Sequence, residues 1–226
     1  MSNKMRGLAV SLAVLASSFA GAVPAMAVSV LDFTGVGGNS YGGDITTFPY
    51  YITVNGGPAE PMMCDDARTE ISIGDSWDAT ANALTLADLP DLKFASMGSA
   101  STVLNDYEMA AYIESGVAQG TIASGDGNAA VWSIFDPAFN TSLDHSQIES
   151  ILGNAQAAVS AGGLNYSGIT IYTPSPLQAS QEFIYGTVSF DPKPQFSSAP
   201  EPGTYAMLGG GLVLLAWIGR RRRSRA

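Results

Sequence analysis

Two apolar segments near the ends of the chain limit what can fold as a water-soluble domain to the residues between them. Lys4 and Arg6 precede an apolar run at residues 8–19, which is followed by the small-x-small sequence Ala25-Met26-Ala27. This order is typical of a secretory signal peptide, and the run is shorter than the roughly 20 residues of a membrane span. We therefore expect residues 1–27 to be a signal peptide that is removed after Ala27.

The second apolar segment, residues 205–219, lies between a Pro-Glu-Pro sequence and a basic block. The Pro-Glu-Pro sequence is Pro200, Glu201 and Pro202, and the basic block contains Arg220, Arg221, Arg222, Arg223 and Arg225. As a helix this segment would span about 20 Å, which is sufficient for a thin bilayer when the flanking side chains reach the interfaces. The arginines favour the cytoplasmic side. We expect a transmembrane helix here, with the preceding domain outside.

The order of these parts resembles the PEP-CTERM sorting signal. The resemblance covers residues 200–226, although Ala199 stands where that family usually has valine. In that family the membrane protease-transpeptidase exosortase cuts near the Pro-Glu-Pro sequence. The resemblance implies that exosortase is a partner, that the chain is exported across the inner membrane of a Gram-negative bacterium, and that its membrane anchoring is transient. The final location would be the outer surface or the extracellular matrix. A plain single-pass anchor is the alternative.

The segment between the two ends is strongly acidic. Between residues 28 and 199 the basic residues are Arg68, Lys93 and Lys193, against nineteen acidic residues, so the formal charge is −16. Such a surface repels nucleic acid, which excludes DNA and RNA as partners. It suits Ca²⁺ or a cationic polymer, but solubility alone also accounts for it. Cys64 is the single cysteine, so the domain has no intramolecular disulfide and must be stabilised by its core.

Short β-branched and aromatic runs predict strands in the first and last thirds of this segment. The predicted strands are residues 28–33, 48–54, 70–73, 83–86, 169–172 and 183–190, and glycine-rich turns bound several of them. In the middle third, apolar residues recur at helical spacing. They predict helices at about 105–118 and 145–161, begun by Asn105 and Asp144, and a buried helix over 128–135.

The expected fold is therefore α+β: a β-rich single domain with two to three helices, flanked by the signal peptide and the C-terminal transmembrane helix. This extracytoplasmic domain would occupy residues 28–191. Residues 192–199, which contain two prolines, would form an extended linker to the sorting signal.

Cys64 is the residue with the most chemical potential. It lies in Met63-Cys64-Asp65-Asp66, and Asn128-Ala129-Ala130-Val131-Trp132 follows later in the chain. The two motifs weakly resemble those of secreted bacterial thioester-forming adhesin domains, in which a glutamine four residues before the tryptophan supplies the acyl group. Asn128 occupies that position here. Its side chain is one methylene shorter, so the resemblance implies a Cys64–Asn128 pair of similar architecture in which the bond itself is disfavoured. The simpler alternative is a buried structural cysteine.

The other candidate sites are less specific. The single histidine, His145, could act as a base for Cys64 only if the fold placed it within hydrogen-bond reach, so we predict no catalytic residues. Five acids in a short stretch, Asp65, Asp66, Glu70, Asp75 and Asp78, could form a structural Ca²⁺ site, although their spacing matches no EF-hand and no other cofactor or metal is indicated. Tyr50, Tyr51, Trp77 and Tyr107 could form a stacking platform for exopolysaccharide.

These observations favour a non-enzymatic protein of the cell envelope or exopolysaccharide matrix. It would be processed at its sorting signal and act through adhesion or structural interactions. The alternative is a covalent, thioester-type adhesin or an enzyme-like domain that uses Cys64.

Overall fold

The computed structural model describes residues 28–190, apart from residues 44, 137 and 140–144. The predicted signal peptide, linker, transmembrane helix and sorting signal lie outside these residues. Within the described part, no helix is long and apolar enough to cross a membrane.

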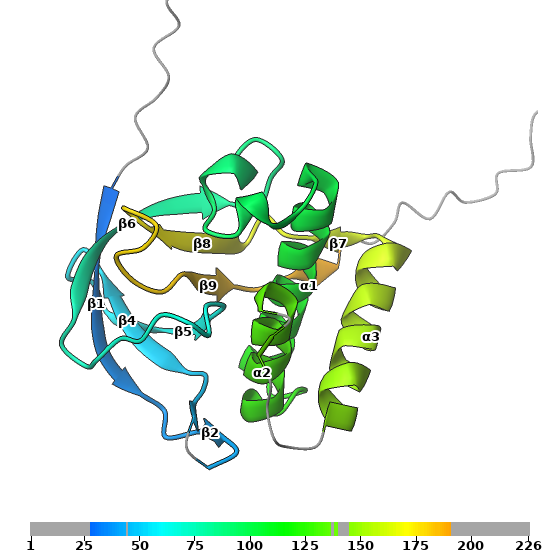
Figure 1. The fold of residues 1–226 in the computed structure, drawn as a ribbon, viewed down its shortest axis with the longest axis horizontal. Helices are drawn as coiled ribbons and strands as arrows, with labels where there is room; N and C mark the ends of the chain where they lie inside the picture. Colours follow the sequence, from blue (N-terminus) through cyan, green and yellow to red (C-terminus); the bar gives the residue numbers. More distant parts are fainter. Residues whose placement is uncertain (1–27, 44, 137, 140–144, 191–226) are drawn as a thin grey trace, which may run out of the picture.

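Six strands form a closed antiparallel barrel (Figure 1). In their order around the barrel they are β1 (Val28–Val36), β4 (Tyr50–Val54), β5 (Ala59–Cys64), β9 (Phe183–Gly186), β8 (Ile169–Pro174) and β6 (Ser76–Ala83), and β6 closes onto β1. The contact between β5 and β9 is the shortest of these pairings, with only Met63 opposite Ile184 and Cys64 opposite Phe183. Cys64 is therefore the last residue of β5, at the strand contact with the fewest paired residues in the barrel.

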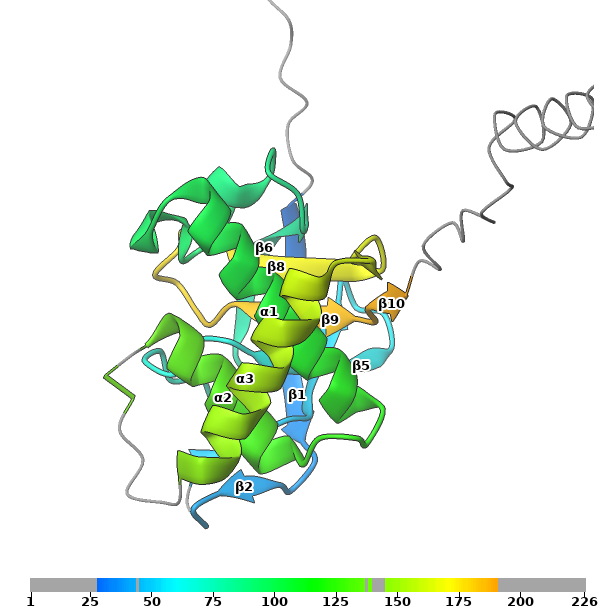
Figure 2. The same cartoon turned by 90° about the vertical axis from the view of Figure 1, so that its right-hand side faces the viewer.

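Three α-helices pack against one side of the barrel (Figure 2). They are α1 (Ala100–Ala118), α2 (Ser124–Phe135) and α3 (His145–Ala161), preceded by two 3₁₀ turns, η1 (Leu89–Asp91) and η2 (Ala95–Met97). Two short ribbons complete the fold, β2 (Ser40–Tyr41) with β3 (Ile45–Thr46), and β7 (Leu164–Asn165) with β10 (Ser189–Phe190). The predicted β-rich α+β class is confirmed.

The strands separate two hydrophobic cores, because successive side chains of a strand point to opposite faces. Met62 and Cys64 join the core inside the barrel, whereas Met63 between them joins the core that the helices form with the outer face. Phe183 and Ile184 divide in the same way. The Cys64 side chain is consequently packed inside the barrel.

Several predicted element boundaries are wrong. Residues 70–73 form no strand, because Ser72 N donates to the Asp75 carboxylate and closes a turn there. Residues 83–86 mostly lie beyond the end of β6. Helix α1 begins at Ala100 rather than near Asn105, and its N-cap is Ser99, whose hydroxyl accepts a hydrogen bond from Thr102 N. Asp144, the predicted start of α3, lies outside the described residues.

The predicted strand over residues 183–190 is divided into β9 and β10. At Gly186, the last residue of β9, φ is +132°, and a Cβ atom would lie 1.9 Å from Gly168 O. Only glycine fits such a position, so the chain changes direction there.

Candidate functional site

Cys64 and Asn128 lie next to each other although 64 residues separate them in the sequence. The Asn128 Nδ2 donates to the Cys64 backbone carbonyl over 2.8 Å, and the Phe48 N–H donates to Asn128 Oδ1 over 2.9 Å. Asn128 is completely buried. The structure therefore brings the predicted pair together, but the amide group of Asn128 binds two backbone groups and joins α2 to the barrel.

The Cys64 thiol is sealed inside the barrel. The side chain has no exposed area, and Sγ lies 3.2 Å from the Asp66 carbonyl oxygen, to which it donates. Burial raises the pKa of the Cys64 thiol well above its usual range, and the neighbouring Asp65 and Asp66 carboxylates raise it further. Because the thiolate is the reactive form, this thiol is chemically quiet at neutral pH.

The position of α2 depends on the glycine before Asn128. A Cβ atom at Gly127 would lie 2.3 Å from Val117 Cγ2 of α1, so only glycine permits this close helix contact. Farther along α2, Trp132 is buried, with its ring centroid 5.2 Å from that of Phe139. The Ala-Val-Trp motif therefore packs α2 in place and holds Asn128 against β5.

A buried polar network continues from Cys64 toward α1. The Glu182 carboxylate accepts hydrogen bonds from the Tyr107 and Thr173 hydroxyls, and from Lys93 N at 3.0 Å. Asp65 and Glu182 are both completely buried. Burial raises the pKa of Asp65 well above its usual range, and the charge of Glu182 raises it further. The buried Glu182 carboxylate therefore disfavours ionisation of Asp65.

Two ion pairs fasten the loop of residues 65–69, which we call the strap, over the end of β5. Lys93 Nζ lies 2.5 Å from Asp66 Oδ2 and also donates to Ser180 O over 2.6 Å. The Lys93 and Asp66 side chains are only 7% and 3% exposed. The second pair, between Arg68 and Asp136, lies at the surface, where the Arg68 side chain is 68% exposed. These are the only two basic residues in the described part of the chain, and both hold the strap.

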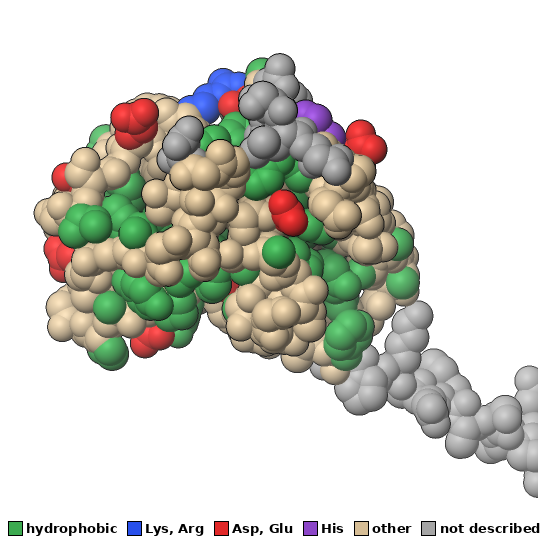
Figure 3. All heavy atoms as spheres, turned by 90° about the horizontal axis from the view of Figure 1, so that it is seen from below, with side chains coloured by type: hydrophobic (Ala, Val, Ile, Leu, Met, Phe, Trp, Pro, Cys, Tyr) green, Lys and Arg blue, Asp and Glu red, His purple; other side chains and the backbone are tan. Residues whose placement is uncertain are grey.

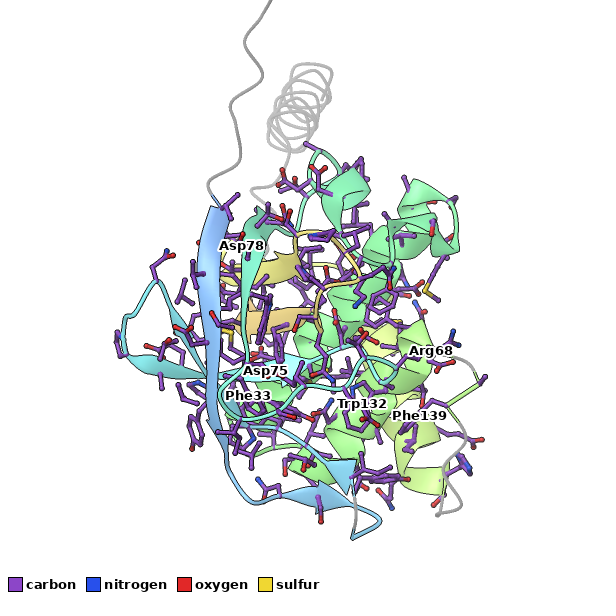
Figure 4. All side chains as sticks on the ribbon, turned by 60° about the vertical axis from the view of Figure 1, so that its left-hand side comes forward. Phe33, Arg68, Asp75, Asp78, Trp132 and Phe139 are labelled. Atoms are coloured by element: carbon purple, nitrogen blue, oxygen red, sulfur yellow. The ribbon has the colours of Figure 1, made fainter. Side chains whose placement is uncertain are left out.

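An open cleft of about 580 Å³ lies on one side of the strap. Phe33 of β1 contributes to its barrel side, and Trp132 and Phe139 contribute to its helical side (Figure 4). Asp66 and Thr69 of the strap complete this part of the lining. The cleft is a mixed apolar and acidic surface immediately outside the Cys64 site.

The predicted sugar-stacking platform does not form. Tyr50, Trp77 and Tyr107 are 6%, 7% and 0% exposed, because their rings fill the two cores, and only Tyr51 reaches the surface. The five acidic residues suggested for Ca²⁺ are also not gathered. In the described part of the chain, no group of three or more acidic, histidine or cysteine side chains could hold a metal ion. Asp66 binds Lys93, and Asp75 binds Ser72 N.

His145 stands at the exposed start of α3, whereas Cys64 is buried. The two residues that sequence reasoning missed are Lys93 and Glu182. Lys93 could have been identified from the sequence, because each of the few basic residues in such an acidic domain is expected to form an ion pair. Nothing near Glu182 in the sequence marks it as buried.

Comparison with known proteins identifies the C-terminal tail. Residues 198–223 match the PEP-CTERM protein-sorting motif. This match confirms the predicted sorting signal, and it indicates an exported protein that exosortase processes at the membrane. No curated protein matches the sequence. Among solved structures, the fold is similar to the N-terminal domain of the Streptococcus pyogenes pilus tip adhesin Cpa, with a TM-score of 0.43 and 14% sequence identity over 76% of this chain and 97% of that domain.

Proposed function

We propose that the domain of residues 28–191 is a non-enzymatic surface or matrix module, which export and exosortase processing deliver outside the cell to bind extracellular polymer without forming a covalent bond. The observation that carries the non-covalent assignment is the bonding of Asn128. Both polar groups of its amide are used by the backbone of Phe48 and Cys64. An acyl donor needs its carbonyl carbon presented to the thiol, and this amide is instead held in a structural role.

The state of the thiol supports the same proposal. A nucleophilic cysteine is usually partly exposed and has a lowered pKa, whereas Cys64 is fully buried and burial raises its pKa. The acidic surface also fits a soluble domain delivered into the extracellular space. Figure 3 shows acidic side chains scattered among apolar patches on one face, with few basic side chains.

A covalent adhesin is the second candidate, and one observation favours it. Asn128 Nδ2 lies 2.8 Å from the Cys64 backbone carbonyl oxygen, so the amide is next to the residue that carries the thiol. Condensation of the thiol with the amide would form a thioester and release ammonia, which lowers the mass by about 17 Da.

Mass and thiol alkylation of the processed protein separate the two candidates. We expect an unmodified mass, no alkylation of Cys64 in the folded protein, and complete alkylation after denaturation without any added nucleophile. A mass deficit of about 17 Da that disappears in the Asn128→Ala variant would establish the covalent form and refute the proposal.

A further inference from the structure

A second cavity, far along the chain from the strap, is lined by both apolar and polar side chains. It is a groove of about 540 Å³ between α1 and α3, within the roughly 300–1,000 Å³ of ordinary ligand sites. Two helix faces form its walls. On α1 and its C-cap residue Gln119, the lining residues Tyr112, Gly116 and Gln119 are spaced by four and three positions. On α3 the residues Gln147, Ile151 and Asn154 have the same spacing. Such spacing places each set on one helix face.

The base of this groove is apolar. Ile122, Leu164 and Val188 contribute to the lining. Gly116 of α1 also lines the groove, and because it has no side chain it takes up little of the space. A Cβ atom at Gly116 would lie 2.7 Å from Ile122 Cδ1, so a larger residue would disturb the base. An apolar base with polar walls is the usual arrangement of a ligand site, in which the polar groups fix the orientation.

Two polar side chains of the α3 wall have no hydrogen-bond partner among the described residues. These residues, Gln147 and Asn154, are both exposed. They are seven residues apart, so about 10.5 Å of helix separates them. Each carboxamide offers both donors and an acceptor, which suits the hydroxyl groups of a sugar. Gln119 on the opposite wall spends its Nε2 on Ser115 Oγ, at 3.0 Å.

Aromatic rings and a low charge are two further features of the groove lining. Tyr112 lines the groove, and Phe190 at its edge is 74% exposed, the highest value among the large apolar side chains of the described region. Exposed rings bind the apolar faces of other groups at low entropic cost. Among the described residues of the lining, Asp126 is the only charged one and none is basic. The described lining therefore offers an anionic polymer no counter-charge.

From this combination we propose that the α1–α3 groove binds a neutral polysaccharide, with its sugar hydroxyls on Gln147 and Asn154 and a ring face on Phe190. This inference rests on the proposed function, because it names the polymer class and the place of contact. Phe190 directly precedes the stretch that leads to the sorting signal, so the groove lies at the end of the domain from which the tail departs.

The test measures binding of the processed protein to neutral tetrasaccharides, maltotetraose and cellotetraose, and to tetragalacturonic acid as an anionic probe of the same length. We expect a neutral tetrasaccharide to bind and the anionic one not to bind. Gln147→Ala and Asn154→Ala should each weaken binding about tenfold, the amount expected for one lost hydrogen bond. Phe190→Ala should weaken it as well. Gln178→Ala, an exposed glutamine outside the groove, is the matched control and should leave binding unchanged.

Binding of neither neutral probe, binding that the groove variants leave unchanged, or preferred binding of the anionic probe would overturn the inference. Fractionation in the native host distinguishes this failure from failure of the proposed function. If the groove variants stay with the extracellular polysaccharide as the wild type does, the groove is wrong and the function stands. If the wild-type protein never associates with it, the proposed function fails.

Discussion

At the scale of single residues, the amide of Asn128 has a structural role. The Asn128 amide hydrogen-bonds both the Cys64 carbonyl and the Phe48 N–H. A buried amide with both of its polar groups paired in this way stabilises the fold. The sequence predicted the pairing from two short motifs. It could not predict the partners of the amide, because Phe48 belongs to a segment 80 residues away.

Glu114 is a second buried residue with a measurable effect. Burial raises its pKa from 4.5 to about 8, and its Oε2 has no hydrogen-bond partner in the described region. Between these values the native state keeps a proton that the unfolded chain loses, so this residue lowers stability as the pH rises. Glu114→Gln removes that titration. We expect the free energy of unfolding to fall less from about pH 5 to about pH 8 in the variant than in the wild type.

Urea unfolding at several pH values measures this difference. Glu149→Gln, at an exposed position on α3, is the matched control and should keep the wild-type slope. Equal pH dependence in Glu114→Gln and the wild type would show that Glu114 is ionised in the folded protein.

At the scale of elements, the sequence predicted strands with alternating large apolar residues and missed those without them. β8 was predicted because Ile169 and Ile171 stand two positions apart, and the structure buries both of them. β6 was missed because its inward positions are Trp77 and Ala79. Trp77 stacks on Phe183 inside the barrel, with ring centroids 6.0 Å apart. Because these two rings fill the interior, the next inward position of β6 holds the small residue Ala79. β5 was missed because Pro61 interrupts its pattern.

The strap is the element whose stability depends most on charge. Lys93→Ala would leave Asp66 buried without its counter-ion, which typically costs about 3–5 kcal/mol. We expect a lower unfolding midpoint and faster alkylation of Cys64 in the native state. Arg68→Ala is the matched control, because it removes the exposed pair of the same strap, and it should change both quantities little. Equal effects of the two variants would contradict the claim that the Lys93–Asp66 pair stabilises the strap more than the Arg68–Asp136 pair does.

At the scale of the whole molecule, the ends and the middle of the chain give different kinds of information. The tail motif predicts delivery because a membrane enzyme reads it as a short linear sequence. The function of the domain depends on surfaces that only the fold assembles. The α1–α3 groove draws its walls from residues 112–119 and 147–154, and no local pattern connects these stretches. The predicted aromatic platform does not form, because Tyr50, Trp77 and Tyr107 face the two cores.

The central claim is that the chain is exported, processed at its sorting signal, and delivered as a domain with a free, buried thiol. The most direct measurement is the intact mass of the protein recovered from the native host, with both termini mapped. We predict an N-terminus at Val28, a C-terminus near residues 200–202, and an unmodified Cys64. A mature protein that retains the arginine block, or one whose mass requires a bond between Cys64 and Asn128, would contradict this account.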